Sequence, residues 1–337
     1  MNRVFRTLLV CTLGVWLIAC AGGGGDSQAG AGGGNHMLIA MIAKSSTNPV
    51  FLAGRTGAEA AAKELAPEGV TIEIAWLTPP QEDGQLQAQR IQQAVNDGAD
   101  AILVSVSDAG KVTGAINDAV DRGVPVMTFD SDAPDSKRFA YYGVDDLKTG
   151  RSVMAELATL MSGKGVIAIL AGNQNAPNLQ RRVQGAREEA AKYPGMRIVD
   201  AFNHTETPQD AAAEVIRVNN AYPEINGWAM IGGWALFTPT LLTDLDPARM
   251  KIVSVDALPA QLGYVDKGVA PVLLAQPVYL WGYESVRTII DKVWYKKEVP
   301  EIIPMELIRV SKETLGEWAR QLQAWGFTDV PAEYLAR

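Results

Sequence analysis

The chain has 337 residues, 47% of them hydrophobic, and 30 Lys and Arg against 38 Asp and Glu give a formal net charge of −8. That length suits two lobes better than one typical domain. The negative charge, without a basic cluster in the body of the chain, argues against a nucleic-acid-binding surface, which needs clustered Lys and Arg.

The first 20 residues are expected to be an export signal outside the fold. Arg3 and Arg6 precede an apolar run over 8–19, which is too short to span a bilayer as a mature helix and suits a secretory signal. The run ends at Cys20 in the order LIAC, which resembles a lipoprotein signal, so Cys20 is predicted to carry lipid. An ordinary cleaved signal with a chance cysteine is the alternative. Cys11 lies inside the signal, so we expect no disulfide in the mature protein.

From residue 37 onward, strands and helices are predicted to alternate. The first series has strands over 38–43, 70–76, 101–106 and 126–129, and helices over 50–65, 84–96 and 109–121. The second has strands over 165–170, 197–202, 227–231, 251–255 and 271–275, and helices over 149–161, 180–192, 208–220, 235–242 and 259–266. A helix over 279–293, a strand over 305–309 and a helix over 314–325 follow. Repeated βαβ units form parallel sheets flanked by helices, so we predict an α/β protein with two Rossmann-like lobes.

The stretch GVPVMTFDSD at 123–132 is the centre of the functional prediction. Its continuous apolar run over 126–129 is typical of a buried parallel strand, and Asp130 follows directly. In open α/β sheets, ligands bind outside the carboxyl ends of the strands. Asp130 is therefore predicted to contact a ligand, with a helix cap or a turn as its structural alternative.

Polar residues follow most of the other predicted strands. They include the run over 44–49, Ser105 to Asp108, Asn173 to Asn175, Asn203 to Thr205, Asp256 and Gln276. Amide and charged groups can form paired hydrogen bonds with neighbouring hydroxyls. A cleft between two lobes, lined in this way, suits a neutral, sugar-like ligand.

Five short motifs in this order resemble the periplasmic sugar-binding proteins of ABC importers, the ribose-binding type in particular. They are NPVF at 48–51, GVPVMTFD at 123–130, QRR at 180–182, VSVD at 253–256 and LAQP at 274–277. The resemblance covers about residues 37–310. It implies a type I periplasmic binding protein with a three-crossover hinge, preceded by the signal over 1–20 and a Gly-rich tether over 21–36. The implied lobes are 37–144 plus 277–307 and 145–276 plus 308–337.

The resemblance also implies ligand contacts at particular positions. They lie in the loop after the first strand, at later strand ends and at the start of one second-lobe helix, namely Lys44, Asn48, Phe51, Asp130, Arg182, Trp234, Asp256 and Gln276. The chain departs from the family at Ser131, where an arginine is common, and near Gly232, where the family has an asparagine. We expect Trp234 to fill the space beside Gly232.

Each of these residues also has a structural interpretation. Asn48 suits a turn before Pro49, Phe51 and Trp234 suit the core, and Arg182 suits a charged helix surface. We expect Arg181 and His204 to lie at the surface and Trp228 in a strand core.

The resemblance implies an exported, lipid-anchored and monomeric protein that captures a pentose or hexose for an ABC permease and its ATPase. No cofactor, metal or nucleic acid is expected. Three alternatives stay open: a polyol binder, a sensory ligand presenter and an autoinducer-2 binder. Lys44 and the DSD at 130–132 resemble the autoinducer-2 binders, but the Asp-Gln pair of their second lobe is missing.

Enzyme classes are disfavoured by missing motifs. The loop after the first strand lacks Gly-x-Gly-x-x-Gly, and the nucleophile elbow Gly-x-Ser-x-Gly is absent. Two histidines and no free cysteine in the mature protein argue against a zinc site. A sugar-responsive repressor shares this fold, but here an export signal stands where such a repressor has its helix-turn-helix. We therefore predict a binding protein rather than an enzyme.

Overall fold

The computed structural model describes residues 35–337. The predicted signal over 1–20, Cys20 and nearly all of the predicted tether over 21–36 lie outside the described residues. The first strand already begins at His36, the last residue of that predicted tether.

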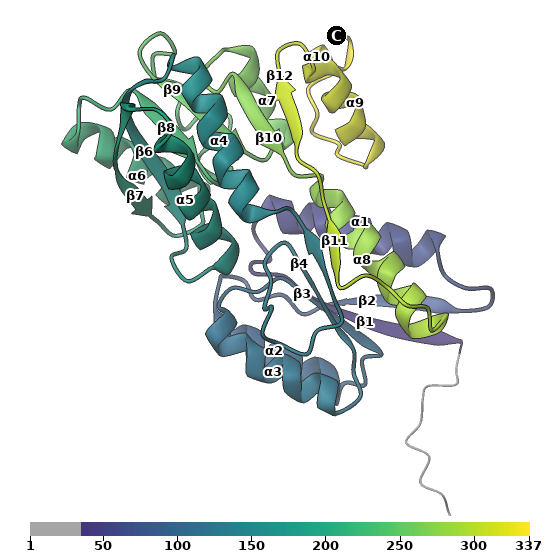
Figure 1. The fold of residues 1–337 in the computed structure, drawn as a ribbon. Coiled ribbons are helices and arrows are strands. Elements are labelled where there is room, and N and C mark those ends of the chain that lie inside the picture. Colours follow the sequence, from purple (N-terminus) through teal and green to yellow (C-terminus); the bar gives the residue numbers. More distant parts are fainter. Residues whose placement is uncertain (1–34) are drawn as a thin grey trace, which may run out of the picture. The chain divides into compact units, whose positions relative to one another are not determined.

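The first sheet contains six parallel strands in the order β11-β5-β4-β3-β1-β2 (Figure 1). Its strands are β1 (His36–Ile42), β2 (Thr71–Trp76), β3 (Ala101–Val104), β4 (Val126–Phe129), β5 (Ala140–Gly143) and β11 (Ile302–Pro304). Its helices are α1 (Pro49–Glu64), α2 (Gly84–Asn96), α3 (Ala109–Asp121) and α8 (Val278–Ile289), which continues as a π-helical turn over Ile290–Trp294.

Successive side chains of β1 point to opposite faces of this sheet. Ile39 and Met41 pack with α1 and α8, whereas Ala40 and Ile42 pack with α2 and α3. Helices cover both faces, which explains why the inner strands β1, β3 and β4 are predominantly apolar. Polar residues therefore stand at the ends of these strands rather than on the faces of the sheet.

The second sheet also contains six strands, in the order β12-β10-β9-β8-β6-β7. They are β6 (Lys164–Gly172), β7 (Gly195–Asn203), β8 (Gly227–Met230), β9 (Lys251–Val255), β10 (Val272–Ala275) and β12 (Ile308–Ser311), of which β12 runs antiparallel to β10. The accompanying helices are α4 (Asp146–Leu160), α5 (Pro177–Ala190), α6 (Pro208–Ala221), α7 (Pro259–Asp266), α9 (Leu315–Ala324) and α10 (Ala332–Leu335).

The chain passes between the two sheets three times, after β5, after β10 and after β11. The predicted fold class, two parallel α/β lobes joined by three crossovers, is thereby confirmed. The two sheets with their helices are called the first and second lobe below.

Two predicted elements were wrong, and one strand was missed. The helix expected over 235–242 is only a 3-10 turn, Trp234–Leu236, because Pro239 disfavours helical backbone at the residue before it and lacks a donor. The single strand expected over 305–309 is two short strands, β11 and β12, which belong to different sheets. Strand β5 was not predicted at all.

Candidate functional site

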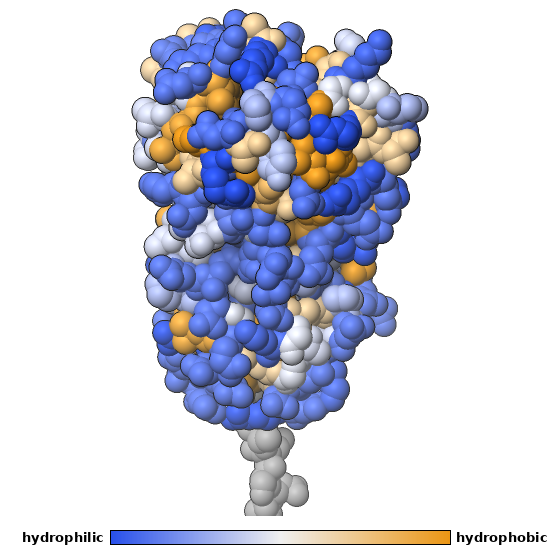
Figure 2. All heavy atoms as spheres, turned by 90° about the vertical axis from the view of Figure 1, so that its left-hand side faces the viewer, coloured by the Kyte–Doolittle hydropathy of each residue, from blue (hydrophilic) through white to orange (hydrophobic). Residues whose placement is uncertain are grey.

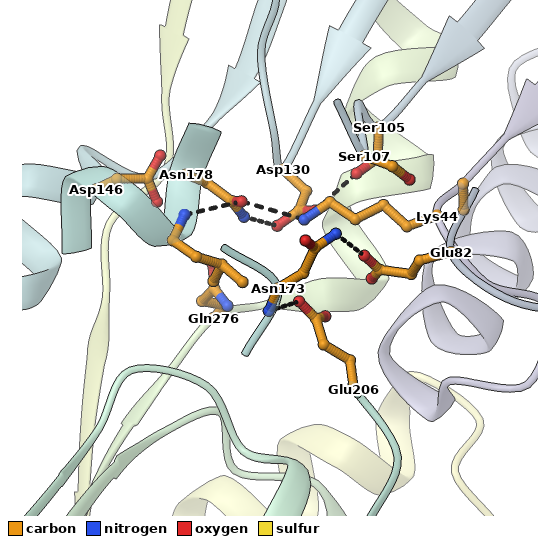
Figure 3. A network of polar contacts seen from close by, with 12 residues as sticks. Lys44, Glu82, Ser105, Ser107, Asp130, Asp146, Asn173, Asn178, Glu206 and Gln276 are labelled. Atoms are coloured by element: carbon orange, nitrogen blue, oxygen red, sulfur yellow. Dashed lines mark hydrogen bonds and ion pairs between the residues drawn. The ribbon is translucent and has the colours of Figure 1, made fainter. Parts of the chain in front are cut away.

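Asp130, at the carboxyl end of β4, is held by side chains from both lobes (Figure 3). Its Oδ2 accepts a hydrogen bond from Ser105 Oγ at 2.7 Å, and its Oδ1 accepts one from Asn178 Nδ2 at 3.2 Å. Lys44 Nζ lies 3.5 Å from Oδ2. Asn178 belongs to α5 of the second lobe, whereas the other three residues belong to the first. The acid that the sequence singled out therefore lies where the two lobes meet.

Lys44 follows β1 and extends into the same place. It is buried, and its Nζ donates a hydrogen bond to Asn178 Oδ1 at 3.1 Å. Burial opposes the charge on this lysine, but the nearby carboxylates, Asp130 first, outweigh burial and raise its pKa. Lys44 thus remains a cation that is matched by Asp130.

The two acids that end β4 and β9 share an uncommon backbone conformation. Asp130 has φ 57° and Asp256 has φ 66°, both in the left-handed region. Non-glycine residues occupy this region rarely, and such positions cluster at functional sites. Asp256 Oδ2 accepts a hydrogen bond from the Gly233 N–H at 3.2 Å. Each lobe thus has one acid at a strand end whose backbone is in the left-handed conformation.

Arg182 links the ends of several second-lobe elements. Its Nε donates to Asp146 Oδ1 at 2.8 Å, its Nη1 to the Ile231 carbonyl at 3.1 Å and its Nη2 to Gln276 Oε1 at 2.9 Å. Gln276 Nε2 in turn donates to Asp256 Oδ1 at 2.8 Å. The side chain of Arg182 is 3% exposed, so its alternative interpretation as a surface charge is wrong. Together with the contacts of Asp130, these form what we call the deep network, namely Lys44, Ser105, Asp130, Asp146, Asn178, Arg182, Asp256 and Gln276.

The close packing of α4 against α5 brings Asp146 and Arg182 together. A methyl group at Gly150 would overlap the carbonyl of Arg182, and one at Gly185 would overlap the carbonyl of Leu147. Only glycine at both positions allows the two helix backbones to approach this closely. The ion pair between the first turn of α4 and α5 therefore depends on these two glycines.

The acids of the deep network are costly to bury. Burial raises the pKa of Asp146 to about 6, although Arg182 acts in the opposite direction. Burial also raises the pKa of Asp256, opposed by the hydrogen bond from Gln276 and by Arg182. Without the arginine, two buried carboxylates would lose their main counter-charge.

Asn48 and Phe51 lie at the start of α1. Asn48 caps this helix, because its Oδ1 accepts a hydrogen bond from Val50 N at 3.2 Å. Phe51 is buried and stacks against Trp281, with ring centroids 5.9 Å apart, and its edge meets Phe129. These residues pack the helix start behind the polar groups.

Trp234 lies in the 3-10 turn after β8 and is also buried. Its ring occupies the space over Gly172 and Gly232, as a methyl group at either glycine would collide with it. The ring of His204 meets it edge-on, with centroids 5.0 Å apart. Trp234 therefore fills the space beside Gly232, as expected. His204, expected at the surface, is half-buried instead.

Sequence analysis missed several polar residues. Asp146 and Asn178 stand in the first turns of α4 and α5 and complete the deep network. Gln87 of α2 is fully buried and holds two loops of the first lobe. Its Nε2 donates to the carbonyls of Ala43 and Ser105, and its Oε1 accepts from Ser107 N at 3.0 Å. Gln87 thus fixes the loops that carry Lys44 and Ser105.

A metal site or a membrane-spanning helix in the described part would bear on function. Within residues 35–337, no group of three or more His, Cys, Asp or Glu side chains is placed to hold a metal ion. Nor does any helix in that part have the length and apolar character needed to cross a membrane. The face shown in Figure 2 is mostly hydrophilic, with hydrophobic residues in separate patches.

The profile of a family described as "periplasmic binding protein domain" matches residues 39–297. The chain belongs to this family, as its motifs predicted. The match begins within β1 and covers every later strand of the two sheets except β11 and β12.

Individual relatives are binding proteins named for sugars or polyols. The D-apiose import binding protein of Actinobacillus succinogenes is 29% identical over 56% of this chain, and the xylitol-binding protein of Mycolicibacterium smegmatis is 24% identical over 58%. The matched regions span 60% and 57% of those two proteins. The crystal structure of GanP, a glucose-galactose binding protein from Geobacillus stearothermophilus, superposes with a TM-score of 0.75 and 26% identity, covering 83% of this chain and 99% of that one. None of the three is named as an enzyme, which agrees with the prediction of a binding protein.

Proposed function

We propose that this protein captures a monosaccharide, a pentose or a hexose, between its two lobes and delivers it to the permease and ATPase of an ABC importer. One observation carries the proposal: Asn178 of the second lobe bonds to Asp130 of the first at 3.2 Å. Polar groups of both lobes therefore converge, and a ligand between them would contact both. The family match and the sugar- and polyol-binding relatives support the proposal.

The charges of the deep network favour a ligand without net charge in this part of the cleft. Lys44 is matched by Asp130, and Arg182 by Asp146. Carboxylates and amides remain to pair with hydroxyl groups. The proposed ligand contacts are Lys44, Asn48, Phe51, Asp130, Arg182, Trp234, Asp256 and Gln276, with the two aromatic residues as apolar walls. The proposal includes neither a metal, nor a cofactor, nor a catalytic step.

The proposed lobes are 37–144 plus 277–307 and 145–276 plus 308–337, with the three crossovers as a hinge. A ligand that touches both lobes stabilises the closed state by its differential affinity. Small-angle scattering should show a smaller radius of gyration at saturation with a binding sugar. An unchanged radius would contradict closure.

We further propose export with a lipid anchor at Cys20, which places a monomeric body at a bacterial membrane. The support is the LIAC sequence and the Gly-rich stretch after it. Replacing Cys20 by Ala should release the protein from the membrane fraction or leave the signal uncleaved. A correctly processed, membrane-bound variant would refute the anchor.

Autoinducer-2 binding is the second candidate, because Lys44 and Asp130 do come together. Asp132, the other acid of that resemblance, does not join Lys44 and Asp130. It is paired with Arg138 instead, whose Nη2 donates to Asp132 Oδ2 at 2.7 Å. A polyol ligand has the support of the xylitol-binding relative. A sensory presenter would use the same binding chemistry.

Calorimetric titration tests the proposed ligand class. The protein should be titrated with pentoses, hexoses, polyols and autoinducer-2 under one set of conditions. A pentose or hexose is expected to bind most tightly and to be recovered chemically unchanged. Binding of autoinducer-2 alone would establish the second candidate, and binding of none would refute the proposal.

A further inference from the structure

A second polar space lies beside the deep network, between loops of the two lobes. This outer cavity has a volume of about 780 Å³, within the range of about 300–1,000 Å³ that ligand pockets occupy. Residues of both lobes line it, among them Thr47, Glu82, Ser107, Asn173, His204 and Glu206. None of the eight proposed ligand contacts lines this cavity. The outer cavity is therefore a distinct region of the cleft.

Two glutamates from different lobes meet in the outer cavity. Glu82 precedes α2 of the first lobe, and Glu206 precedes α6 of the second. Asn173 connects them, because its Nδ2 donates to Glu82 Oε2 at 2.9 Å and its backbone N–H donates to Glu206 Oε1 at 3.0 Å (Figure 3). Burial and then Glu206 raise the pKa of Glu82 well above its ordinary value, while Lys44 opposes them. Two adjoining carboxylates cannot both stay ionised without a cation or a proton between them.

Three polar atoms that line the outer cavity lack partners among residues 35–337. They are Glu82 Oε1, Ser107 Oγ and His204 Nε2, and Ser107 is only 2% exposed. Buried polar atoms in folded proteins are nearly always hydrogen-bonded, so these three atoms remain able to bond to a group that enters the outer cavity.

The unpartnered atoms are mainly acceptors. His204 Nδ1 lies 2.6 Å from the Thr205 carbonyl, which can only accept, so Nδ1 carries the ring proton. Burial lowers the pKa of His204, so the ring is neutral and Nε2 is a bare acceptor. Glu82 Oε1 is an acceptor when ionised, and a serine hydroxyl can accept as well. A ligand group that pairs with these atoms should therefore be rich in donors.

We propose that Glu82 and Glu206 form a subsite for a protonated amino group, so that the ligand is an amine-bearing sugar or polyol whose hydroxyls contact the deep network. This rests on the proposed function and specifies its ligand. An ammonium group offers hydrogen-bond donors and a positive charge, which suit the acceptor atoms and the carboxylate pair that line the outer cavity.

Other occupants fit the outer cavity less well. An anion would face Glu82, Glu206, Asp83 and Asp108, whereas the lining includes a single lysine, Lys111, which lies 3.9 Å from Asp108. A metal ion would want further acidic or histidine ligands, and the described residues supply no group of three. A proton shared by the two glutamates is the remaining alternative. It would neutralise part of their charge while a neutral ligand is bound.

Calorimetry with matched sugar pairs separates an ammonium group from a proton. Glucosamine should be compared with glucose and galactosamine with galactose, each with its N-acetyl derivative, which keeps the bulk but loses the charge. One amine should bind about tenfold or more tightly than its neutral parent, as expected for a charged hydrogen bond.

The titratable and charged groups around Glu82 are Glu206, Lys44, His204, Asp83, Asp108 and Lys111. Repeating the titrations in buffers of different ionisation enthalpy should show proton release when the amine displaces the proton shared by Glu82 and Glu206, and no release with the neutral sugar.

Amide variants assign the effect to the two glutamates. Glu82→Gln and Glu206→Gln keep the shape and remove a charge, so they should abolish the preference for the amine over its neutral parent. Glu68→Gln, at an exposed position, is the control and should keep the preference. If neutral sugars bind and no amine is preferred in the wild type, the subsite is refuted while the proposed function stands. If no sugar of either kind binds, both are refuted. The buffer comparison on the wild type distinguishes the ammonium group from the proton even if a variant fails to fold.

Discussion

The deep network and the outer cavity both lie between the lobes, but they differ in how their polar atoms are satisfied. In the deep network every charged group has a partner of opposite charge or an amide: Asp130 with Asn178, Arg182 with Asp146, Gln276 with Asp256. In the outer cavity, three atoms have no partner within residues 35–337 and two carboxylates adjoin. The protein itself holds the deep network in place, whereas the outer cavity leaves polar atoms able to bond to a ligand. Changes in the deep network should cost stability as well as affinity, whereas changes in the outer cavity should mainly alter specificity.

The largest effect on stability is expected at Arg182. Arg182→Ala would leave the carboxylate of Asp146, the amide of Gln276 and the Ile231 carbonyl without their shared donor. Removing one partner of a buried ion pair costs about 3–5 kcal/mol. Arg181 is the matched control, because it is the adjacent residue and is exposed; Arg181→Ala should change stability by less than about 0.5 kcal/mol. Urea unfolding of both variants measures this, and equal free energies of unfolding would mean that the deep network does not stabilise the fold.

Asp146 should give the deep network a dependence on pH. Its pKa is raised from 3.8 to about 6 in the folded protein, so the folded state binds this proton more tightly than the unfolded chain does. The stability that this group contributes is fully present below pH 3.8 and is lost as the pH rises through about 6. Asp146→Asn cannot titrate. The free energy of unfolding of the wild type minus that of the variant should therefore fall between pH 4 and pH 6 and stay level above. A difference that rises over this range would show that Arg182 dominates and that the pKa is lowered.

Ser105 and Ser107 provide the smallest test of the difference between the deep network and the outer cavity. Ser105 donates to Asp130, whereas Ser107 Oγ has no partner among the described residues. Both are buried and both follow β3. Ser105→Ala should cost about 1 kcal/mol or somewhat more, because Asp130 loses a donor. Ser107→Ala should lie within about 0.5 kcal/mol of the wild type. Thermal unfolding of the pair checks this, and the reverse order would overturn the distinction between the two regions.

The sequence indicated the strand-end part of the site. Asp130, Asp256 and Gln276 each follow an apolar run directly, and the sheet then brings the run ends together. Arg182 came from the family resemblance, since a helical arginine has no local signal that distinguishes a ligand contact from a surface charge. Asn178 could have been placed in a helix, because Pro177 suits the first turn, but the prediction began that helix at 180.

The remaining residues depend on contacts that local sequence does not specify. Glu82 and Glu206 lie in loops of different lobes and meet only in the folded chain. Strand β11 has only three residues and pairs with β5 across some 160 positions, so it has no periodic signal long enough to detect. Strand β5 is as long as the predicted β4, but no helix separates the two, so the alternation of strand and helix did not indicate it. Asp146 becomes a buried partner only because two glycines let α4 and α5 approach.

The central claim, that Asp130 binds a sugar where the lobes meet, is tested most directly by titrating three proteins with the sugar that the wild type binds best. They are the wild type, Asp130→Ala and the exposed control Asp135→Ala. Losing Asp130 should leave sugar hydroxyls and the Asn178 amide unpaired in a buried place, at a cost of about 2–4 kcal/mol, or roughly 30- to 1,000-fold in Kd. The control should bind as the wild type does. Wild-type affinity in a correctly folded Asp130→Ala protein would contradict the claim.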